Sequence, residues 1–202
     1  MGAGRLKMNN EMERWEKGKG IVFLRKIGIR TGQTVLDFGA RSGHYSIPAA
    51  FIVGNNGVIY AVDKEKELLK ELKEKTITLG LHNIITIKTS GKIRLEFGNE
   101  SIDVILLYDV LHYLKKVERK SLYKEILRLL KPNGFLSVYP KHVVGDMPMD
   151  ELKELTLNDV KQEIQNSGFF FTKQLCDEIS HNNSLNQGCI LNFKSAKLEE
   201  IK

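Results

Sequence analysis

Short apolar runs alternate along this chain with longer stretches in which apolar and charged residues recur at helical spacing. Apolar, β-branched runs predict five strands, over 34–38, 58–62, 84–88, 102–107 and 135–139. The amphipathic stretches predict helices over 10–27, 44–53, 64–79 and 117–130. Because the run at 102–107 is the most apolar of the chain, we expect it to be a central strand buried on both faces.

After residue 139 the alternation of strand and helix changes. A further helix is expected over 150–166, and two more strands over 169–175 and 189–194. The polar stretch between these strands, 177–188, is long for a hairpin, and two strands with no helix between them predict an antiparallel pair at one edge. The predicted fold is an α/β three-layer sandwich. Its seven-stranded, mostly parallel sheet has one antiparallel edge strand and helices on both faces.

Chain length and composition favour one globular domain. With 202 residues, of which 42% are hydrophobic and 28% charged, the chain can bury a substantial core. We expect a single domain over 1–202, with 1–18 as an N-terminal extension. The apolar runs fall short of the roughly 18 residues that span a bilayer, and 1–10 is polar, unlike a secretion signal. The expected location is therefore the cytoplasm.

The two cysteines, Cys176 and Cys189, leave two interpretations open. A disulfide between them is conceivable, but reduced and partly buried thiols are the expected state in a cytoplasmic protein. Neither cysteine lies near a His and Asp cluster with metal-ligand spacing, so no metal site is predicted.

The net charge of +6 invites a nucleic-acid hypothesis. The lysines, however, alternate with glutamates, as in Lys64-Glu65-Lys66-Glu67, which is typical of a solvated helix face. A nucleic-acid partner is therefore the less favoured alternative, no membrane partner is expected, and the oligomeric state is left open.

The loop after the first predicted strand carries the strongest chemical signal. In an open α/β sheet, ligands bind beyond the carboxyl ends of the strands. Gly39 and Gly43 follow Asp37 there, and glycine lets the backbone turn sharply and approach a ligand closely. The helix expected to begin near His44 directs its free N–H groups to the same place.

The second predicted strand ends in a carboxylate, Asp63, beside this loop. A carboxylate at that position can accept hydrogen bonds from both hydroxyls of a ribose, each worth about 1.5–3 kcal/mol. The geometry suits any adenosine ligand and does not by itself choose among cofactors.

Four segments in this order resemble class I S-adenosylmethionine-dependent methyltransferases over about residues 20–194. Asp37, Gly39 and Gly43 match the family's first motif, and Asp63 matches its acidic second strand end. The segments 102–112 and 129–135 are similar to its fourth strand and to the turn before its fifth. The resemblance implies S-adenosyl-L-methionine as cofactor. It assigns cofactor binding to Asp37, Gly39, Ala40, Arg41, Gly43, Asp63, Lys64, Ser90, Gly91 and Tyr108.

The chain departs from the family pattern at two positions. Arg41 stands where the family has its middle glycine, so a positive φ there would cost about 1–3 kcal/mol. Its guanidinium would then either intrude on the methionine pocket or contact the cofactor's carboxylate or an acidic acceptor. Ser90 stands where the family often places an acidic residue against adenine, and a hydroxyl binds less strongly than a carboxylate.

Beyond the fourth strand, Asp109 and His112 face the expected acceptor region and are the candidate catalytic residues. Packing or solvation is the alternative role for His112. Neither a nicotinamide fingerprint nor a phosphate-binding Gly-Lys-Ser/Thr motif is present.

The expected function is methyl transfer to a small-molecule acceptor. The alternatives are an RNA or protein methyltransferase, and a cofactor-binding partner subunit with weak or no catalysis.

Overall fold

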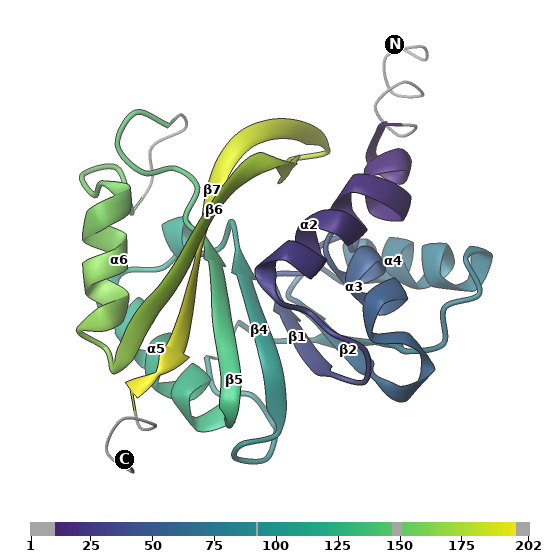
Figure 1. Ribbon diagram of the computed structural model, residues 1–202, viewed down its shortest axis with the longest axis horizontal. Helices are drawn as coiled ribbons and strands as arrows, with labels where there is room; N and C mark the ends of the chain where they lie inside the picture. Colours follow the sequence, from purple (N-terminus) through teal and green to yellow (C-terminus); the bar gives the residue numbers. More distant parts are fainter. Residues whose placement is uncertain (1–10, 92, 147–150, 197–202) are drawn as a thin grey trace. The chain divides into compact units, whose positions relative to one another are not determined.

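The computed structural model describes residues 11–91, 93–146 and 151–196 and contains a seven-stranded sheet (Figure 1). The strands are β1 (Thr34–Phe38), β2 (Val58–Asp63), β3 (Ile84–Lys88), β4 (Ile102–Tyr108), β5 (Leu130–Tyr139), β6 (Phe169–His181) and β7 (Ser184–Ser195). Their order is β3-β2-β1-β4-β5-β7-β6. The pairs β1–β2, β2–β3 and β4–β5 are parallel, and β7 is antiparallel to β5. The predicted fold class is confirmed, with β7 between β5 and the outermost strand β6.

Helical segments connect the strands. They are η1 (Trp15–Lys19), α2 (Gly20–Ile27), α3 (Ser46–Val53), η2 (Gly54–Asn56), α4 (Lys66–Thr78), η3 (Leu111–Tyr113), α5 (Lys116–Leu129) and α6 (Leu157–Gln165). None of the helices in the described part of the chain is both long enough and apolar enough to cross a bilayer.

The chain divides into two compact units. The first comprises residues 1–89 and 176–188, and the second comprises 90–175 and 189–202. Residues 1–10 of the predicted N-terminal extension lie outside the described residues. Within the remainder of that extension, Trp15 is almost fully buried, and its ring packs edge-on against Tyr45 at 5.2 Å.

In the first unit, α3 and α4 pack on the parallel strands β1, β2 and β3. Ala61 of β2 and Leu72 of α4 belong to one buried cluster together with Ile47 of α3 and Ala40 of the loop after β1. This packing fixes the loop after β1 against the sheet, because Ala40 is itself part of the core.

In the second unit, α5 packs on β5, and β4 is buried along nearly its whole length, as its apolar sequence predicts. Residues 131–134, predicted as the turn before a strand, lie within β5, where the pairing with β4 is irregular between Ile102 and Val104. Helix α6 begins at Leu157, later than the predicted start at 150, and residue 150 lies outside the described part of the chain. Thr156 explains the later start, because its hydroxyl caps the helix at the backbone N–H of Asp159.

The polar stretch 177–188, expected as a long connection, is mostly strand. Strand β6 continues to His181 and β7 begins at Ser184, so that only Asn182 and Asn183 form the turn between them. Both asparagines have positive φ (48° and 61°), which a two-residue hairpin turn of the primed type requires and which asparagine tolerates. We refer to residues 180–183 as the hairpin tip.

Both cysteines are disulfide-bonded, which contradicts the expectation of reduced thiols. The predicted strand 169–175 stopped one residue before Cys176, which belongs to β6, whereas Cys189 lies in β7 as predicted.

Candidate functional site

The loop after β1 adopts the left-handed backbone that its glycines permit. Gly39 and Gly43 have φ of 86° and 89°, and Arg41 between them has φ of 48°. The N–H groups of Gly39 and Ala40 donate to the carbonyl of Val62 on β2, at 2.8 and 3.1 Å. The loop therefore leaves β1 still bonded to β2, which keeps its backbone beside the carboxyl end of that strand.

Gly43 allows this loop to approach α4 closely. A Cβ atom at Gly43 would overlap the side chain of Leu72, and the positive φ disfavours any L side chain there as well. The second motif glycine is thus required both for its backbone conformation and for the space it leaves.

Asp37, the acidic residue of the motif, is buried in β1 and accepts a hydrogen bond from the Ser46 hydroxyl at 2.6 Å. Burial raises the pKa of this carboxyl to about 6, because desolvation disfavours the charged form. The hydrogen bond from Ser46 lowers the pKa, and the charge of Asp63 raises it further. Asp37 therefore titrates much closer to neutral pH than an exposed aspartate.

Asp63 ends β2 with its carboxylate fixed by two backbone donors. Oδ2 accepts from the N–H of Arg41 and Oδ1 accepts from the N–H of Glu65, both at 2.8 Å. A carboxylate offers about four lone-pair sites, so these two bonds orient Asp63 and leave each oxygen able to accept a second donor. Such a carboxylate suits the paired hydroxyls of a ribose, and in this respect the residues fit an adenosyl ligand.

The side chain of Arg41 is exposed and turned toward the hairpin tip. Its Nη1 donates to Oδ1 of Asn182 at 3.0 Å. The positive φ confirms that this position needs the left-handed conformation that a glycine would adopt without strain. The arginine therefore carries a backbone cost, and its guanidinium is held by a residue of the same compact unit.

A chain of polar contacts that the sequence analysis missed joins the N-terminal helix, the glycine loop and the hairpin tip. His44 Nδ1 lies 2.6 Å from Oε1 of Glu16, and His44 Nε2 lies 2.7 Å from Oδ1 of Asn183. Glu16 is 1% exposed and also pairs with Lys75 at 3.5 Å. The Asn-Asn dipeptide was the available signal for a turn, but nothing in the sequence indicated where that turn would pack.

The other residues assigned to the cofactor differ in their surroundings. Lys64 is exposed after β2, and Ser90 and Gly91 are exposed after β3. Tyr108 is buried at the end of β4, where its hydroxyl lies 2.7 Å from the hydroxyl of Ser137 on β5. Lys64 belongs to the first unit, and Ser90, Gly91 and Tyr108 belong to the second.

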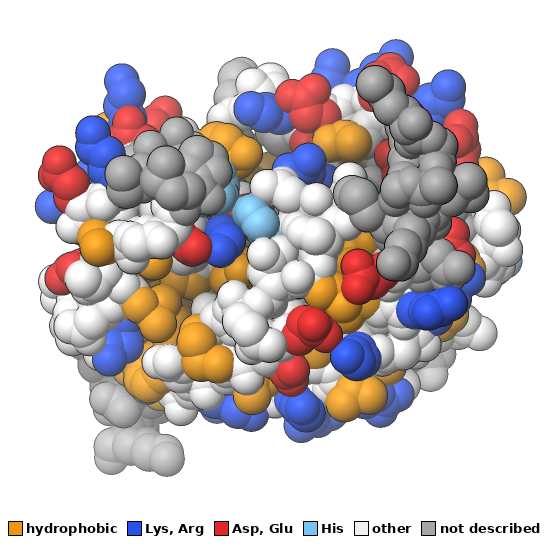
Figure 2. Space-filling view, turned by 90° about the horizontal axis from the view of Figure 1, so that it is seen from above, with side chains coloured by type: hydrophobic (Ala, Val, Ile, Leu, Met, Phe, Trp, Pro, Cys, Tyr) orange, Lys and Arg blue, Asp and Glu red, His pale blue; other side chains and the backbone are white. Residues whose placement is uncertain are grey.

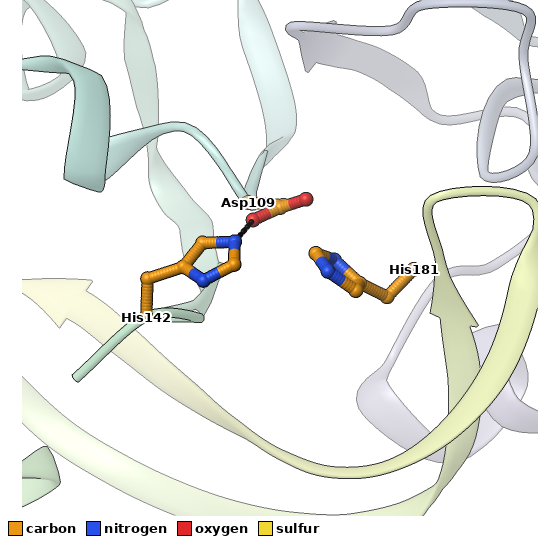
Figure 3. A group of neighbouring side chains, drawn as sticks. All are labelled: Asp109, His142 and His181. Atoms are coloured by element: carbon orange, nitrogen blue, oxygen red, sulfur yellow. Dashed lines mark ion pairs between the residues drawn. The ribbon is translucent and has the colours of Figure 1, made fainter. Parts of the chain in front are cut away.

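At the carboxyl end of β4, the second unit gathers one carboxylate and two imidazoles. Asp109 Oδ1 lies 3.4 Å from His112 Nδ1. The same oxygen lies 3.5 Å from His142 Nε2, and this ion pair is the dashed line in Figure 3. The two imidazole rings stand edge to face with centroids 4.3 Å apart. The candidate catalytic residues Asp109 and His112 are therefore brought together, and His142, which directly follows Pro140-Lys141 beyond β5, was missed by sequence reasoning.

The charge of Asp109 also affects the pKa of the neighbouring Tyr139. Burial, and after it the charges of Asp109 and Asp146, raise the pKa of Tyr139 above its ordinary value, so Tyr139 stays a neutral phenol. The backbone N–H of Asp109 donates to the carbonyl of Tyr139 at 3.0 Å, which ties the ends of β4 and β5 together.

Comparison with known proteins identifies relatives of one kind. Residues 35–134 match the family described as a methyltransferase domain. The chain is 34% identical over 85 residues to a probable cobalt-precorrin-6B C(15)-methyltransferase of Saccharolobus solfataricus, which covers 42% of this chain and 43% of the relative. It is 27% identical over 143 residues to a fibrillarin-like rRNA/tRNA 2′-O-methyltransferase of Pyrobaculum calidifontis, covering 69% and 59%. The chain thus spans only about half the length of these curated relatives.

Solved structures with a similar fold include a methyltransferase. A SAM-dependent methyltransferase from Aquifex aeolicus superposes with a TM-score of 0.72 at 22% identity, covering 93% of this chain and 96% of that one. At 22% identity, this structural similarity shows that the two proteins share a fold and shows nothing about a shared function.

Proposed function

We propose that this chain, whose residues 35–134 match the methyltransferase-domain family, binds S-adenosyl-L-methionine and transfers the methyl group to an acceptor. The observation that carries the proposal is the pairing of the left-handed glycine loop with Asp63, whose carboxylate is oriented by the N–H groups of Arg41 and Glu65.

Each group of the loop has a role in this proposal. Asp63 accepts the ribose hydroxyls, Gly39 and Gly43 bring the backbone close to the methionine end, and Ser90 with Gly91 lies on the adenine side. When bound, the cofactor supplies a methyl group already activated by its sulfonium sulfur. The protein's task is therefore chiefly to hold donor and acceptor in line, about 3–3.5 Å apart.

Asp37 adds an electrostatic contribution to cofactor binding. A buried carboxyl whose pKa is raised to about 6 is ionised above that pH, and the cofactor carries a cationic amino group. Binding a cation nearby favours the ionised carboxylate, so the affinity for the cofactor should rise as the pH increases through 6.

For the acceptor we propose a small molecule. Lysine, arginine and acidic side chains are interspersed over the face shown in Figure 2, as their alternation in the sequence predicts. An RNA-binding surface is instead marked by clustered basic residues. Because one relative is named an rRNA/tRNA methyltransferase, RNA is the alternative acceptor that the experiments must distinguish from a small molecule.

Calorimetric titration tests the cofactor. We expect S-adenosylhomocysteine to bind with a micromolar dissociation constant, and ATP, which shares the adenosine, to bind at least about 100-fold more weakly, because the glycine loop lacks a phosphate-binding lysine. Equal binding of ATP would contradict an adenosyl-sulfonium site.

Arg41 favours a second candidate, a partner subunit with weak or no catalysis. If S-adenosylhomocysteine binds Arg41→Gly but not the native chain, the guanidinium blocks the site and this candidate holds. If the native chain binds it and a short RNA binds with a steep salt dependence, the acceptor is RNA.

A further inference from the structure

The cluster of Asp109, His112 and His142 contains two residues with an uncommon backbone conformation. Asp109 and His142 have φ of 57° and 65°, in the left-handed region that few non-glycine residues adopt and that Asp and His enter more readily than most. Two neighbouring strand ends thus each carry a left-handed residue whose side chain belongs to the same cluster. Left-handed non-glycine residues are common at functional sites.

The three side chains differ in how well solvent reaches them. The imidazoles are nearly sealed, with side-chain exposures of 2% for His112 and 3% for His142, whereas Asp109 is 16% exposed. Both imidazoles contact the same carboxylate oxygen, Oδ1 of Asp109. Figure 3 shows the other carboxylate oxygen of Asp109 pointing away from His142. Asp109 is therefore the member of the cluster that a ligand can reach.

We propose that Asp109, backed by His112 and His142, removes a proton from the methyl acceptor, and that the acceptor is consequently a hydroxyl compound. This inference rests on the proposed function. Thiolates form readily near neutral pH and need only positioning, whereas a hydroxyl keeps its proton and gains from a base. A carboxylate with two buried imidazoles beside one of its oxygens therefore favours a hydroxyl acceptor over a thiolate.

The acceptor oxygen attacks the methyl carbon, the carbon–sulfur bond breaks, and its electron pair stays on sulfur. The hydroxyl proton passes to the outward oxygen of Asp109 and then to solvent. His112 and His142 are positioning residues, because their ring nitrogens lie 3.4 and 3.5 Å from Oδ1, on the side of the carboxylate away from the acceptor.

Other charged groups surround the cluster and enter any pH profile. Lys141 pairs with Asp146 at 2.6 Å, and Asp146 also accepts the backbone N–H of His142 at 3.2 Å. Tyr139 stays neutral, and the ring of Tyr113 lies 3.8 Å from that of His112. The charges of Lys141 and Asp146 therefore compensate one another.

The first test asks whether a proton moves during methyl transfer. The rate of transfer from S-adenosylmethionine to 4-nitrophenol is compared in H₂O and in D₂O. We expect the native chain to be slower in D₂O, because the proton passes to Asp109 as the methyl group is transferred, and Asp109→Asn to show no such difference. Equal rates of the native chain in the two solvents would overturn the proposal.

The second test measures transfer of a tritiated methyl group from S-adenosylmethionine to substituted phenols and to thiocyanate, which has no proton to lose. Asp109→Asn should reduce transfer to phenols about 100-fold or more. His142→Gln should shift the pH profile of that transfer, and transfer to thiocyanate should change less than threefold. Transfer by the native chain to thiocyanate alone, or to neither acceptor, would overturn the hydroxyl assignment.

The controls separate this proposal from folding and from the proposed function. Asp103→Asn changes an aspartate at the opposite end of β4, paired with Lys131, and His82→Asn changes an exposed histidine. Both should retain native activity. Calorimetry should give the same affinity for S-adenosylhomocysteine in Asp109→Asn as in the native chain. If the native chain does not bind S-adenosylhomocysteine, the result contradicts the proposed function and not the role of Asp109. Stoichiometric zinc in the purified protein would mean that the cluster is a metal site, contrary to the proposal.

Discussion

At the scale of the residue, the sequence indicated which positions matter but not the environment of each one. Gly39 and Gly43 were expected to turn the chain, and their φ angles confirm it. Arg41 was expected to be strained if its φ were positive, and it is. The partner of its guanidinium, Asn182, lies 141 positions away in the sequence, so no local pattern predicted that contact. His142 was missed for the same reason, since only the pairing of β4 with β5 brings it to Asp109.

Asp37 gives a prediction for the pH dependence of stability. Its pKa is raised from 3.8 to about 6 in the folded state, so between these values the unfolded chain releases a proton that the folded chain retains. The contribution of Asp37 to stability is therefore fully present below about pH 4, falls as the pH rises, and is lost above 6. The cost above 6 is at most about 3 kcal/mol, from two pKa units at 1.36 kcal/mol each.

Replacing the carboxyl removes this cost. Asp37→Asn keeps an oxygen that accepts from Ser46, so we expect it to raise the free energy of unfolding by about 2 kcal/mol at pH 7.5 and to leave it unchanged at pH 4. Urea unfolding at the two pH values measures the difference. A stabilisation of equal size at both would show that the charge is not its cause.

At the scale of the element, types and order were predicted well and ends poorly. Helix α6 starts at its Thr156 cap rather than at 150, and β6 and β7 extend through polar residues to a two-residue turn. The polar composition of 177–188 suggested a loop, but this hairpin tip packs its polar side chains on the glycine loop, where Asn182 and Asn183 hold Arg41 and His44. Tertiary contacts therefore decided the secondary structure of this stretch.

A buried ion pair joins helices α5 and α6, and its contribution to stability can be tested. Arg119 is 2% exposed and makes two hydrogen bonds to Glu163, both at 2.8 Å. Glu163→Gln leaves the buried guanidinium without its counter-charge, and we expect a loss of about 3 kcal/mol in the free energy of unfolding. Chemical denaturation measures it. As a control, Glu178→Gln breaks an exposed pair with Lys19 and should leave the unfolding midpoint unchanged, and equal effects of the two substitutions would refute the role of burial.

At the scale of the whole molecule, the alternation of strands and helices predicted a mostly parallel sheet but not the order of its strands. Parallel strands linked through helices form right-handed crossovers, which leaves few topologies, and the order β3-β2-β1-β4-β5-β7-β6 is one of them. The acceptor was not predictable in this way, because it depends on which side chains meet at the strand ends. The central claim is that Asp63 holds the ribose of an adenosyl cofactor.

Calorimetry of the native chain with S-adenosylhomocysteine and with its 2′-deoxy analogue tests that claim without altering the protein. A hydrogen bond to a carboxylate contributes about 1.5–3 kcal/mol, so we predict that the analogue binds about 10- to 150-fold more weakly. Equal affinity for the two ligands would contradict the assignment of Asp63 to the ribose.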